Sequence, residues 1–172
     1  DKGGSWDYDI EMPGFKYNMT DVQAALGLHQ LDRLAGFHAR RVEVVDSYRE
    51  AFGDDERFIV PTEREYAKSA WHLYVLRLNL EALSVDRNEF ISELARRNIG
   101  SSVHYRPLHM MSYYAKKYGF APEDFPVAHQ AFGQIVPLPL HPRLTQDDIA
   151  DVVEAVRGAA RAASARPSVA LR

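Results

Sequence analysis

The chain has 172 residues, of which 46% are hydrophobic and 26% charged, as expected for a globular domain with a core of its own. Its formal net charge of -3 argues against the basic surfaces that bind nucleic acid or anionic membranes. The absence of cysteine excludes disulfides, thiolate metal sites and cysteine nucleophiles, and it fits a reducing, cytoplasmic location. No apolar run approaches the roughly 18 residues of a membrane span, so no membrane partner is expected.

Residues 1–19 are predicted to form a loop, because glycine and proline interrupt any regular pattern there. The first five residues hold neither a methionine nor a signal-peptide pattern, so we expect the chain to begin inside a longer protein or after processing. The loop carries more aromatic side chains than a mobile linker does, and we expect it to pack on another surface. These aromatic residues are Trp6, Tyr8, Phe15 and Tyr17.

Residues 20–52 are predicted to form one long helix, because apolar side chains recur near the helical period. Thr20 is a suitable N-cap, and Gln23 can return a hydrogen bond to the Thr20 N–H to complete a capping box. Gly36 could interrupt the helix, and Gly53 is expected to end it. One face of the predicted helix has only small residues, namely Ala24, Ala25 and Gly27. This face could pack within the chain or against another subunit, and both interpretations fit equally well.

Residues 53–158 are predicted to form a small α/β domain with about three strands and helices on one face. Asp86 with Glu89, and Thr145, mark two helix starts. Gly100 is expected to end the first of these helices. The other helices are expected at residues 111–118 and 127–135, and extended segments at residues 58–60, 70–80, 101–105 and 136–140. Residues 70–80 and 101–105 are predicted to be strands, and His72, Tyr74, Leu76 and Leu78 share one face of the first. The two prolines in residues 136–140 predict an edge strand or a very short one. Residues 159–172 have little to bury and are predicted to be a disordered tail.

The densest group of chemically versatile side chains runs from Val103 to His109, at a predicted strand end and turn. It holds two imidazoles, a phenol and a guanidinium, which can bind a phosphate or a sugar hydroxyl. A buried histidine with one hydrogen bond is an equally good interpretation of His104, whereas a binding role is favoured for Tyr105 and His109. No metal site is expected, because zinc needs three or four ligands and no partner is spaced to complete the set.

Lys16 and Asn18 lie just before the predicted helix start, where backbone N–H groups point outward and anions such as phosphate bind well. On the physics alone, a solvated loop before a capped helix is the commoner arrangement.

Four stretches of the chain together resemble the DegT/DnrJ/EryC1/StrS family of pyridoxal-phosphate-dependent sugar aminotransferases. They are G-F-K-Y-N-M-T-D-V-Q-A-A-L-G-L at residues 14–28, W-H-L-Y at 71–74, N-I-G-S-S-V-H-Y-R-P-L-H at 98–109 and L-P-L-H-P-R-L-T at 138–145. The resemblance extends from Gly14 to Val156. It implies the C-terminal, small domain of a type I aminotransferase fold, preceded by a long interdomain or interface helix.

The resemblance also implies roles for particular residues. Asn18 would reach across a homodimer interface to the cofactor phosphate of the neighbouring subunit, with Lys16 and Tyr17 beside it shaping the substrate site. His104, Tyr105 and His109 would lie near a nucleotide-linked keto-sugar, which receives its amino group from glutamate in a ping-pong reaction. The loop of residues 1–19 would pack on the large domain or on the dimer partner.

Pyridoxal-phosphate enzymes hold their cofactor through a Schiff-base lysine. No lysine here lies in the S-x-H-x-x-K pattern of the family; the lysines are Lys2, Lys16, Lys68, Lys116 and Lys117. The lysine is therefore expected upstream of Asp1, no catalytic residue is assigned in this chain, and the chain alone is expected to be inactive.

Two alternatives from other functional classes remain at this point. One is a non-catalytic regulatory or scaffold protein derived from the same family. The other is a carbohydrate-binding module that stacks sugars on Trp6, Tyr8 and Tyr17.

Overall fold

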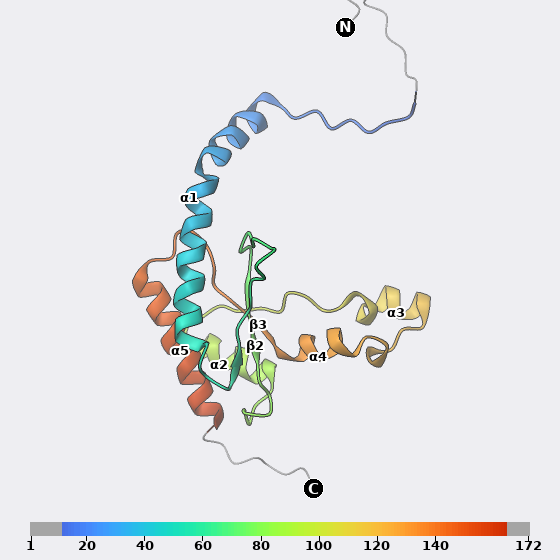
Figure 1. The fold of residues 1–172 in the computed structure, drawn as a ribbon. Coiled ribbons are helices and arrows are strands. Elements are labelled where there is room, and N and C mark those ends of the chain that lie inside the picture. Colours follow the sequence, from blue (N-terminus) through green and yellow to red (C-terminus); the bar gives the residue numbers. More distant parts are fainter. Residues whose placement is uncertain (1–11, 165–172) are drawn as a thin grey trace, which may run out of the picture. The chain divides into compact units, whose positions relative to one another are not determined.

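The computed structural model describes residues 12–164 of the chain. The elements it contains, drawn in Figure 1, are α1 (Asp21–Phe52), β1 (Phe58–Ile59), β2 (Tyr74–Leu78), α2 (Arg87–Arg96), the 3-10 turn η1 (Leu108–Met110), α3 (Ser112–Tyr118), the 3-10 turn η2 (Pro122–Asp124), α4 (Pro126–Gln134), β3 (Ile135–Leu138) and α5 (Gln146–Ser164). The chain divides into two units, residues 1–35 and residues 36–172, which are described separately.

The described part of the first unit is an exposed segment followed by the start of α1. Thr20 N donates to Gln23 Oε1 at 3.0 Å and Gln23 N donates to Thr20 Oγ1 at 3.3 Å, which confirms the predicted capping box. The helix is not interrupted at Gly36. Large apolar side chains are exposed throughout this unit, namely Met12, Phe15, Tyr17, Met19, Val22, Leu26, Leu28, Leu31 and Leu34. Trp6 and Tyr8 lie outside the described residues.

The second unit is built on a three-stranded antiparallel sheet in the order β1-β2-β3. Tyr74, Leu76 and Leu78 in β2 are fully buried, which confirms the predicted alternation along this strand. The strand is shorter than predicted, because Trp71 adopts a left-handed φ of 46° and breaks the extended conformation before Tyr74. His72, predicted on the same face as Tyr74, is exposed.

The core fills the space between the buried face of the sheet and the helices α1, α2 and α5. Figure 1 shows α5 and the part of α1 in this unit on one side of β2 and β3, and the segment containing α3 and α4 projecting from the other side. An unbroken series of ring contacts crosses the core, with centroid distances of 5.0 to 6.3 Å. It runs through Tyr74, Tyr48, Phe52, Phe58 and Phe90.

The predicted starts of α2 and α5 are confirmed by reciprocal hydrogen bonds. Asp86 Oδ1 accepts from Glu89 N at 2.8 Å, and Asp86 N donates to Glu89 Oε2. Thr145 Oγ1 accepts from Asp148 N at 3.1 Å, and Thr145 N donates to the Asp148 carboxylate, which holds the pKa of that group below its usual range. Both helix starts are therefore fixed by side chains three residues apart.

The end of α2 differs from the prediction, because Asn98 rather than Gly100 supplies the left-handed residue. Asn98 has a φ of 62°, its N–H reaches Ala95 O at 3.0 Å, and Ile99 N reaches Leu94 O at 2.9 Å. This pair of hydrogen bonds is the Schellman motif, in which asparagine substitutes for the more usual glycine.

The strand predicted at residues 101–105 is wrong, because this segment forms no strand. It lies beside β3, where Ser101 Oγ donates to Pro137 O at 2.7 Å. Pro137 and Pro139 have no N–H, so the outer edge of β3 lacks donors for another ladder of backbone hydrogen bonds. The prediction that residues 136–140 form an edge strand is confirmed in β3, which pairs only with β2 in the described sheet.

The predicted tail begins too early, because α5 continues past Gly158 to Ser164. The sequence after Gly158 lacks large apolar side chains, but Ala159, Ala160 and Ala163 are buried. Small side chains on one helix stripe let α2 approach α5 closely, so the core needs no large residue there. Ser84 donates through N and Oγ to Ala163 O, which ties down the last turn. The rest of the predicted tail, residues 165–172, lies outside the described residues.

Candidate functional site

The loop between α2 and η1 carries two of the predicted substrate-binding residues on the surface. His104 is half-buried and Tyr105 is 71% exposed, and their rings meet edge to face at 4.8 Å. Ser102 Oγ lies 3.2 Å from the His104 ring nitrogens, so the imidazole has a hydroxyl partner. Arg106, next along the chain, is exposed. The loop therefore presents an imidazole, a phenol and a guanidinium together at an accessible surface.

His109 is placed differently from His104 and Tyr105. It lies in η1 with only 7% of its surface exposed, and its ring packs against Phe125 at 4.6 Å. Its Nε2 is buried and has no hydrogen-bond partner among residues 12–164. A ligand could reach this nitrogen only if neighbouring side chains moved, so a substrate contact by His109 remains a prediction.

Lys16, Tyr17 and Asn18 lie in the first unit, in the exposed segment before α1. Tyr17 is 85% exposed and its ring lies 5.8 Å from that of Phe15. An amide and an ammonium group in the segment just before a helix start are suited to a phosphate oxygen. The chemistry of this segment thus fits a contribution to a phosphate site, although it does not make a complete cofactor pocket.

None of the described lysines is enclosed by protein. Lys16, Lys68, Lys116 and Lys117 are all exposed, and the Lys117 ammonium lies over the rings of Tyr113 and Tyr118 at 5.4 Å. A lysine that anchors a cofactor must be positioned inside a site that also holds the cofactor ring. The described part of the chain contains no lysine in such a position.

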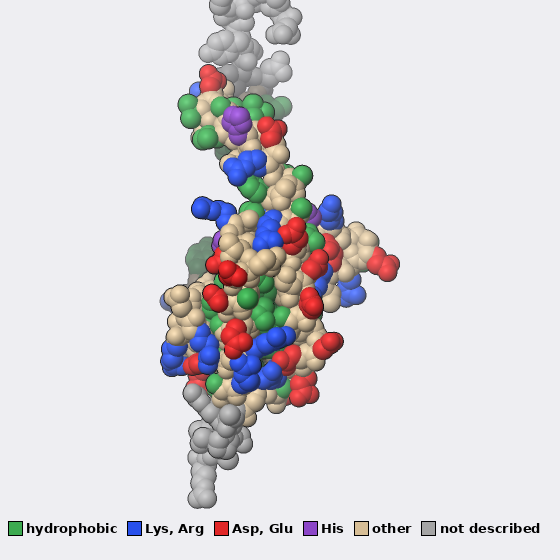
Figure 2. Space-filling model, turned by 90° about the vertical axis from the view of Figure 1, so that its left-hand side faces the viewer, with side chains coloured by type: hydrophobic (Ala, Val, Ile, Leu, Met, Phe, Trp, Pro, Cys, Tyr) green, Lys and Arg blue, Asp and Glu red, His purple; other side chains and the backbone are tan. Residues whose placement is uncertain are grey.

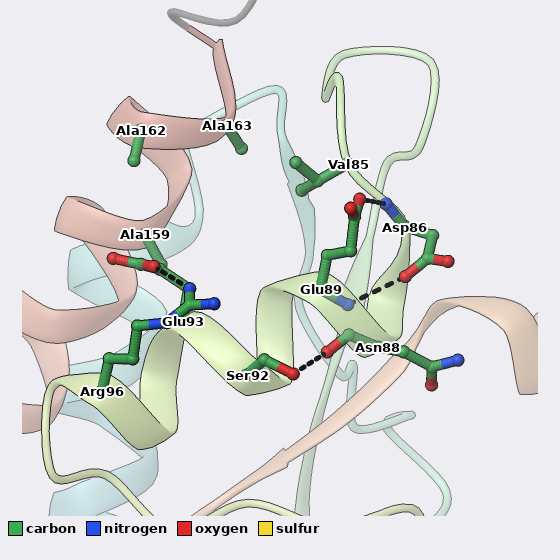
Figure 3. A pocket seen from close by; sticks show the side chains of 10 residues that line it. All are labelled: Val85, Asp86, Asn88, Glu89, Ser92, Glu93, Arg96, Ala159, Ala162 and Ala163. Carbon is green, nitrogen blue, oxygen red and sulfur yellow. Dashed lines mark hydrogen bonds and ion pairs between the residues drawn. The ribbon is translucent and has the colours of Figure 1, made fainter.

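A groove of about 240 Å³ lies between α2 and α5 (Figure 3), and its polar groups are already paired with one another. Asp86 and Glu89 form the cap described above, and Ser92 Oγ donates to Asn88 O at 2.9 Å. Glu93 accepts from Arg96 at 2.6 Å and from Arg97, and these hydrogen bonds lower the pKa of its carboxyl. With its polar groups committed in this way, the groove offers little to a ligand.

A pocket that the sequence analysis did not single out lies between β2 and α4. It has a volume of about 500 Å³, and Arg77, His129, Gln130 and Gln134 are among the residues that line it. The signal in the sequence was a single arginine within the apolar run of residues 73–78, on the strand face opposite Leu76 and Leu78.

Other classes of site are not represented in the part of the chain that the structure describes. Basic and acidic side chains are interspersed over the face that carries α5, as Figure 2 shows. Between residues 12 and 164 no group of three or more His, Asp and Glu side chains is arranged to hold a metal ion. None of the helices in this range combines the length and the apolar character that a membrane-spanning segment requires.

Comparison with known proteins decides the family. The model of the DegT/DnrJ/EryC1/StrS aminotransferase family matches residues 2–157. The chain belongs to this family. The resemblance that the sequence motifs suggested is thereby confirmed over nearly the whole chain.

Two curated relatives are each 45% identical to the chain. They are the uncharacterized protein MJ1066 of Methanocaldococcus jannaschii, over 154 residues, and the spore coat polysaccharide biosynthesis protein SpsC of Bacillus subtilis, over 155 residues. In both cases the match covers 90% of this chain but only 40% of the relative.

The solved structure of Spr1654 from Streptococcus pneumoniae, assigned as a sugar aminotransferase, superposes with a TM-score of 0.82 at 37% identity. The superposed region covers 95% of this chain and 40% of the Spr1654 chain. Spr1654 has been solved in apo, PMP and PLP forms. The family member described here therefore has the fold of the C-terminal portion of these aminotransferases, as predicted.

Proposed function

We propose that the chain is the C-terminal part of a longer pyridoxal-phosphate-dependent aminotransferase, which transfers an amino group from glutamate to a nucleotide-linked keto-sugar in the cytoplasm. The observation that carries this proposal is the family match over residues 2–157, together with a fold shared with a sugar aminotransferase at a TM-score of 0.82. The spore coat polysaccharide role of SpsC supports a sugar substrate.

In this proposal the chain supplies binding groups, and the lysine that holds the cofactor comes from the preceding part of the polypeptide. Pyridoxal phosphate supplies the electron sink for amino-group transfer when it is bound. Asn18 would donate a hydrogen bond to its phosphate in the neighbouring subunit, and Lys16 would add positive charge nearby. A neutral amide and a cation next to a helix N-terminus suit this role.

The substrate side of the site would be formed by the loop before η1. Tyr105 can donate its phenol O–H to a sugar or phosphate oxygen, and its exposure leaves that group free to do so. His104, held beside Ser102 Oγ and the Tyr105 ring, can orient the phenol or bind the ligand itself. His109 would stiffen this end of the loop through its packing against Phe125, or contact substrate after a rearrangement.

A homodimer would explain the exposed apolar side chains of the first unit. Phe15 and Tyr17 are 86% and 85% exposed, and Val22 on α1 is 72% exposed. Aromatic and apolar side chains clustered in this way on a surface are characteristic of interfaces. Cofactor binding by Asn18 in trans requires such a partner.

The experiment that tests the cofactor role is Asn18→Ala in the longer protein. Loss of a hydrogen bond to a charged phosphate should weaken pyridoxal-phosphate binding by roughly tenfold or more. Asn88→Ala on the exposed surface of α2 is the matched control and should leave the affinity unchanged. An unchanged affinity in Asn18→Ala would refute the phosphate role.

The 172-residue chain itself gives a second test. Because no described lysine is enclosed, the purified chain should not retain pyridoxal phosphate after dialysis, as judged by visible absorbance. Retention of a stoichiometric amount would overturn the assignment of the cofactor lysine to a preceding segment. A source protein that consists of this chain alone would instead favour a regulatory or scaffold protein derived from the family.

A further inference from the structure

We propose that the pocket between β2 and α4 binds the carboxylate or phosphate group of a small molecule through Arg77. Its key residue stands at the centre of the outer sheet face, since Arg77 pairs with Ile59 of β1 on one side and with Ile135 of β3 on the other. Two isoleucines therefore flank the base of this side chain. This inference does not depend on the proposed function.

The guanidinium of Arg77 is held in place but its charge is not neutralised. Nε and Nη2 both donate to Gln134 Oε1, at 3.2 and 2.6 Å. Gln134 is itself 91% buried, since only 9% of its surface is exposed, so it fixes the orientation of the guanidinium. No ion pair joins Arg77 to a carboxylate within residues 12–164. A partly buried cation whose partner is a neutral amide retains an affinity for an anion.

Arg87, on α2, gives a comparison within the same unit, because it is buried, with 8% of its surface exposed, and donates to two different acceptors. Its Nη1 donates to Phe132 O at 3.0 Å, its Nε donates to Asn88 Oδ1, and its guanidinium lies 4.9 Å from the Phe132 ring centroid. Arg77 Nη1 makes no hydrogen bond in the described part of the chain, and it is not among the buried unpaired atoms. This nitrogen is therefore accessible to solvent, and Arg77 is one of the residues that line the pocket.

The remaining lining suits an oxyanion attached to a small body. His129 and Gln130, from α4, add polar side chains at the wall opposite the sheet, and Ile59 and Leu80 add apolar surface. Glu81 also lines the pocket, where it is exposed and can turn to solvent. A volume of about 500 Å³ is in the range of small-molecule sites, and the planar fork of arginine matches carboxylate and phosphate oxygens.

The test is a titration of the ¹⁵N-labelled 172-residue chain with sodium phosphate and, separately, with sodium acetate, against sodium chloride at equal ionic strength. We expect saturable shifts of the backbone amides of Arg77, His129, Gln130 and Gly133 with at least one of the two anions, and not with chloride. Tighter binding of phosphate assigns the site to phosphate-bearing ligands, and tighter binding of acetate assigns it to carboxylates.

Arg77→Lys keeps the positive charge but removes the fork, so it should weaken binding about tenfold. Arg96→Lys, on the exposed surface of α2, is the matched control and should bind as the unchanged chain does. Shifts that do not saturate with either anion, shifts that centre elsewhere, or equal affinity in Arg77→Lys would overturn the proposal. The titration of the unchanged chain decides the question even if the variant does not fold.

Discussion

Tyr48 and Tyr74 should respond to loss of their hydroxyl groups in opposite ways. Both side chains have no exposed surface, and their ring centroids lie 5.0 Å apart. Tyr48 OH donates to Pro139 O at 2.9 Å, whereas Tyr74 OH has no partner among the described residues. Replacement by phenylalanine leaves both rings in place and removes only the polar atom.

The magnitudes follow from these two environments. Tyr48→Phe removes one hydrogen bond and leaves the Pro139 carbonyl without this donor, so the free energy of unfolding should fall by about 1–2 kcal/mol. Tyr74→Phe removes a buried hydroxyl that gains nothing from the fold, so the free energy of unfolding should rise by roughly 1 kcal/mol. For a domain of this size each kcal/mol corresponds to about 2–4 °C in Tm.

Urea denaturation followed by circular dichroism measures both changes, provided that the dependence of the free energy of unfolding on urea concentration (the m-value) is the same in all variants. Tyr66→Phe is the control, because Tyr66 is 89% exposed and its hydroxyl is solvated in both states. If Tyr74→Phe destabilised the protein as much as Tyr48→Phe, the Tyr74 hydroxyl would have a partner in solution and the reasoning from the unpaired atom would fail.

Three further predictions concern the backbone and the core. Asn98→Gly should raise the free energy of unfolding by roughly 0.5–1 kcal/mol in urea denaturation, because glycine adopts the φ of 62° without steric cost. The free energy of unfolding should fall above pH 10, because unfolded tyrosine ionises near pH 10 whereas burial raises the pKa of Tyr74 to about 12; Tyr74 alone contributes up to about 1.4 kcal/mol per pH unit between pH 10 and 12, and Tyr48, whose pKa burial also raises, adds to this. Gly133→Ala in α4, where an added Cβ meets nothing within 4 Å, should stabilise the protein by roughly 0.5–1 kcal/mol in thermal unfolding, whereas Gly53→Ala should destabilise it because its Cβ would lie 2.7 Å from Arg49 O.

Each of these predictions has a clear contradictory result. A loss of stability in Asn98→Gly would mean that the asparagine side chain stabilises the α2 end more than its backbone strain costs. An alkaline slope that stayed the same in Tyr74→Phe would show that Tyr74 does not titrate as the structure implies. Equal effects of the Gly53 and Gly133 substitutions would contradict the difference in local space.

The helix starts could be predicted from the sequence because a capping box depends only on residues three apart. Thr20 with Gln23 and Asp86 with Glu89 both form as predicted. The edge position of residues 136–140 could also be predicted from the sequence, since proline removes a backbone donor wherever it occurs.

The features that were predicted wrongly depend on partners far away in the chain. Glycine is the more frequent residue at a helix end, but the chain turns at Asn98, where Ile99 can pack on the core. Residues 101–105 have a strand-like sequence, yet Pro137 in β3 and Pro139 just after it have no N–H to donate to a further strand. The burial of the alanines after Gly158 could not be predicted, because the sequence does not reveal that α2 lies close to α5.

The candidate site was predictable in composition but not in geometry. The sequence placed His104, Tyr105 and His109 in one motif, and the structure puts the first two on the surface and the third in a small aromatic cluster. His104 and His109 differ in burial because His109 lies in η1, which turns the chain inward after Pro107. Arg77 stood out only as an arginine in an apolar strand, and its pocket requires α4, which follows about fifty residues later.

The intact mass of the protein purified from its source under denaturing conditions tests the central claim most directly. The account predicts a mass more than twice the 19.5 kDa of this chain, because the chain covers only 40% of each curated relative. The additional sequence should contain the cofactor lysine. A mass of 19.5 kDa would contradict the account, because the chain would then stand alone, and residues 12–164 contain no lysine placed to hold the cofactor.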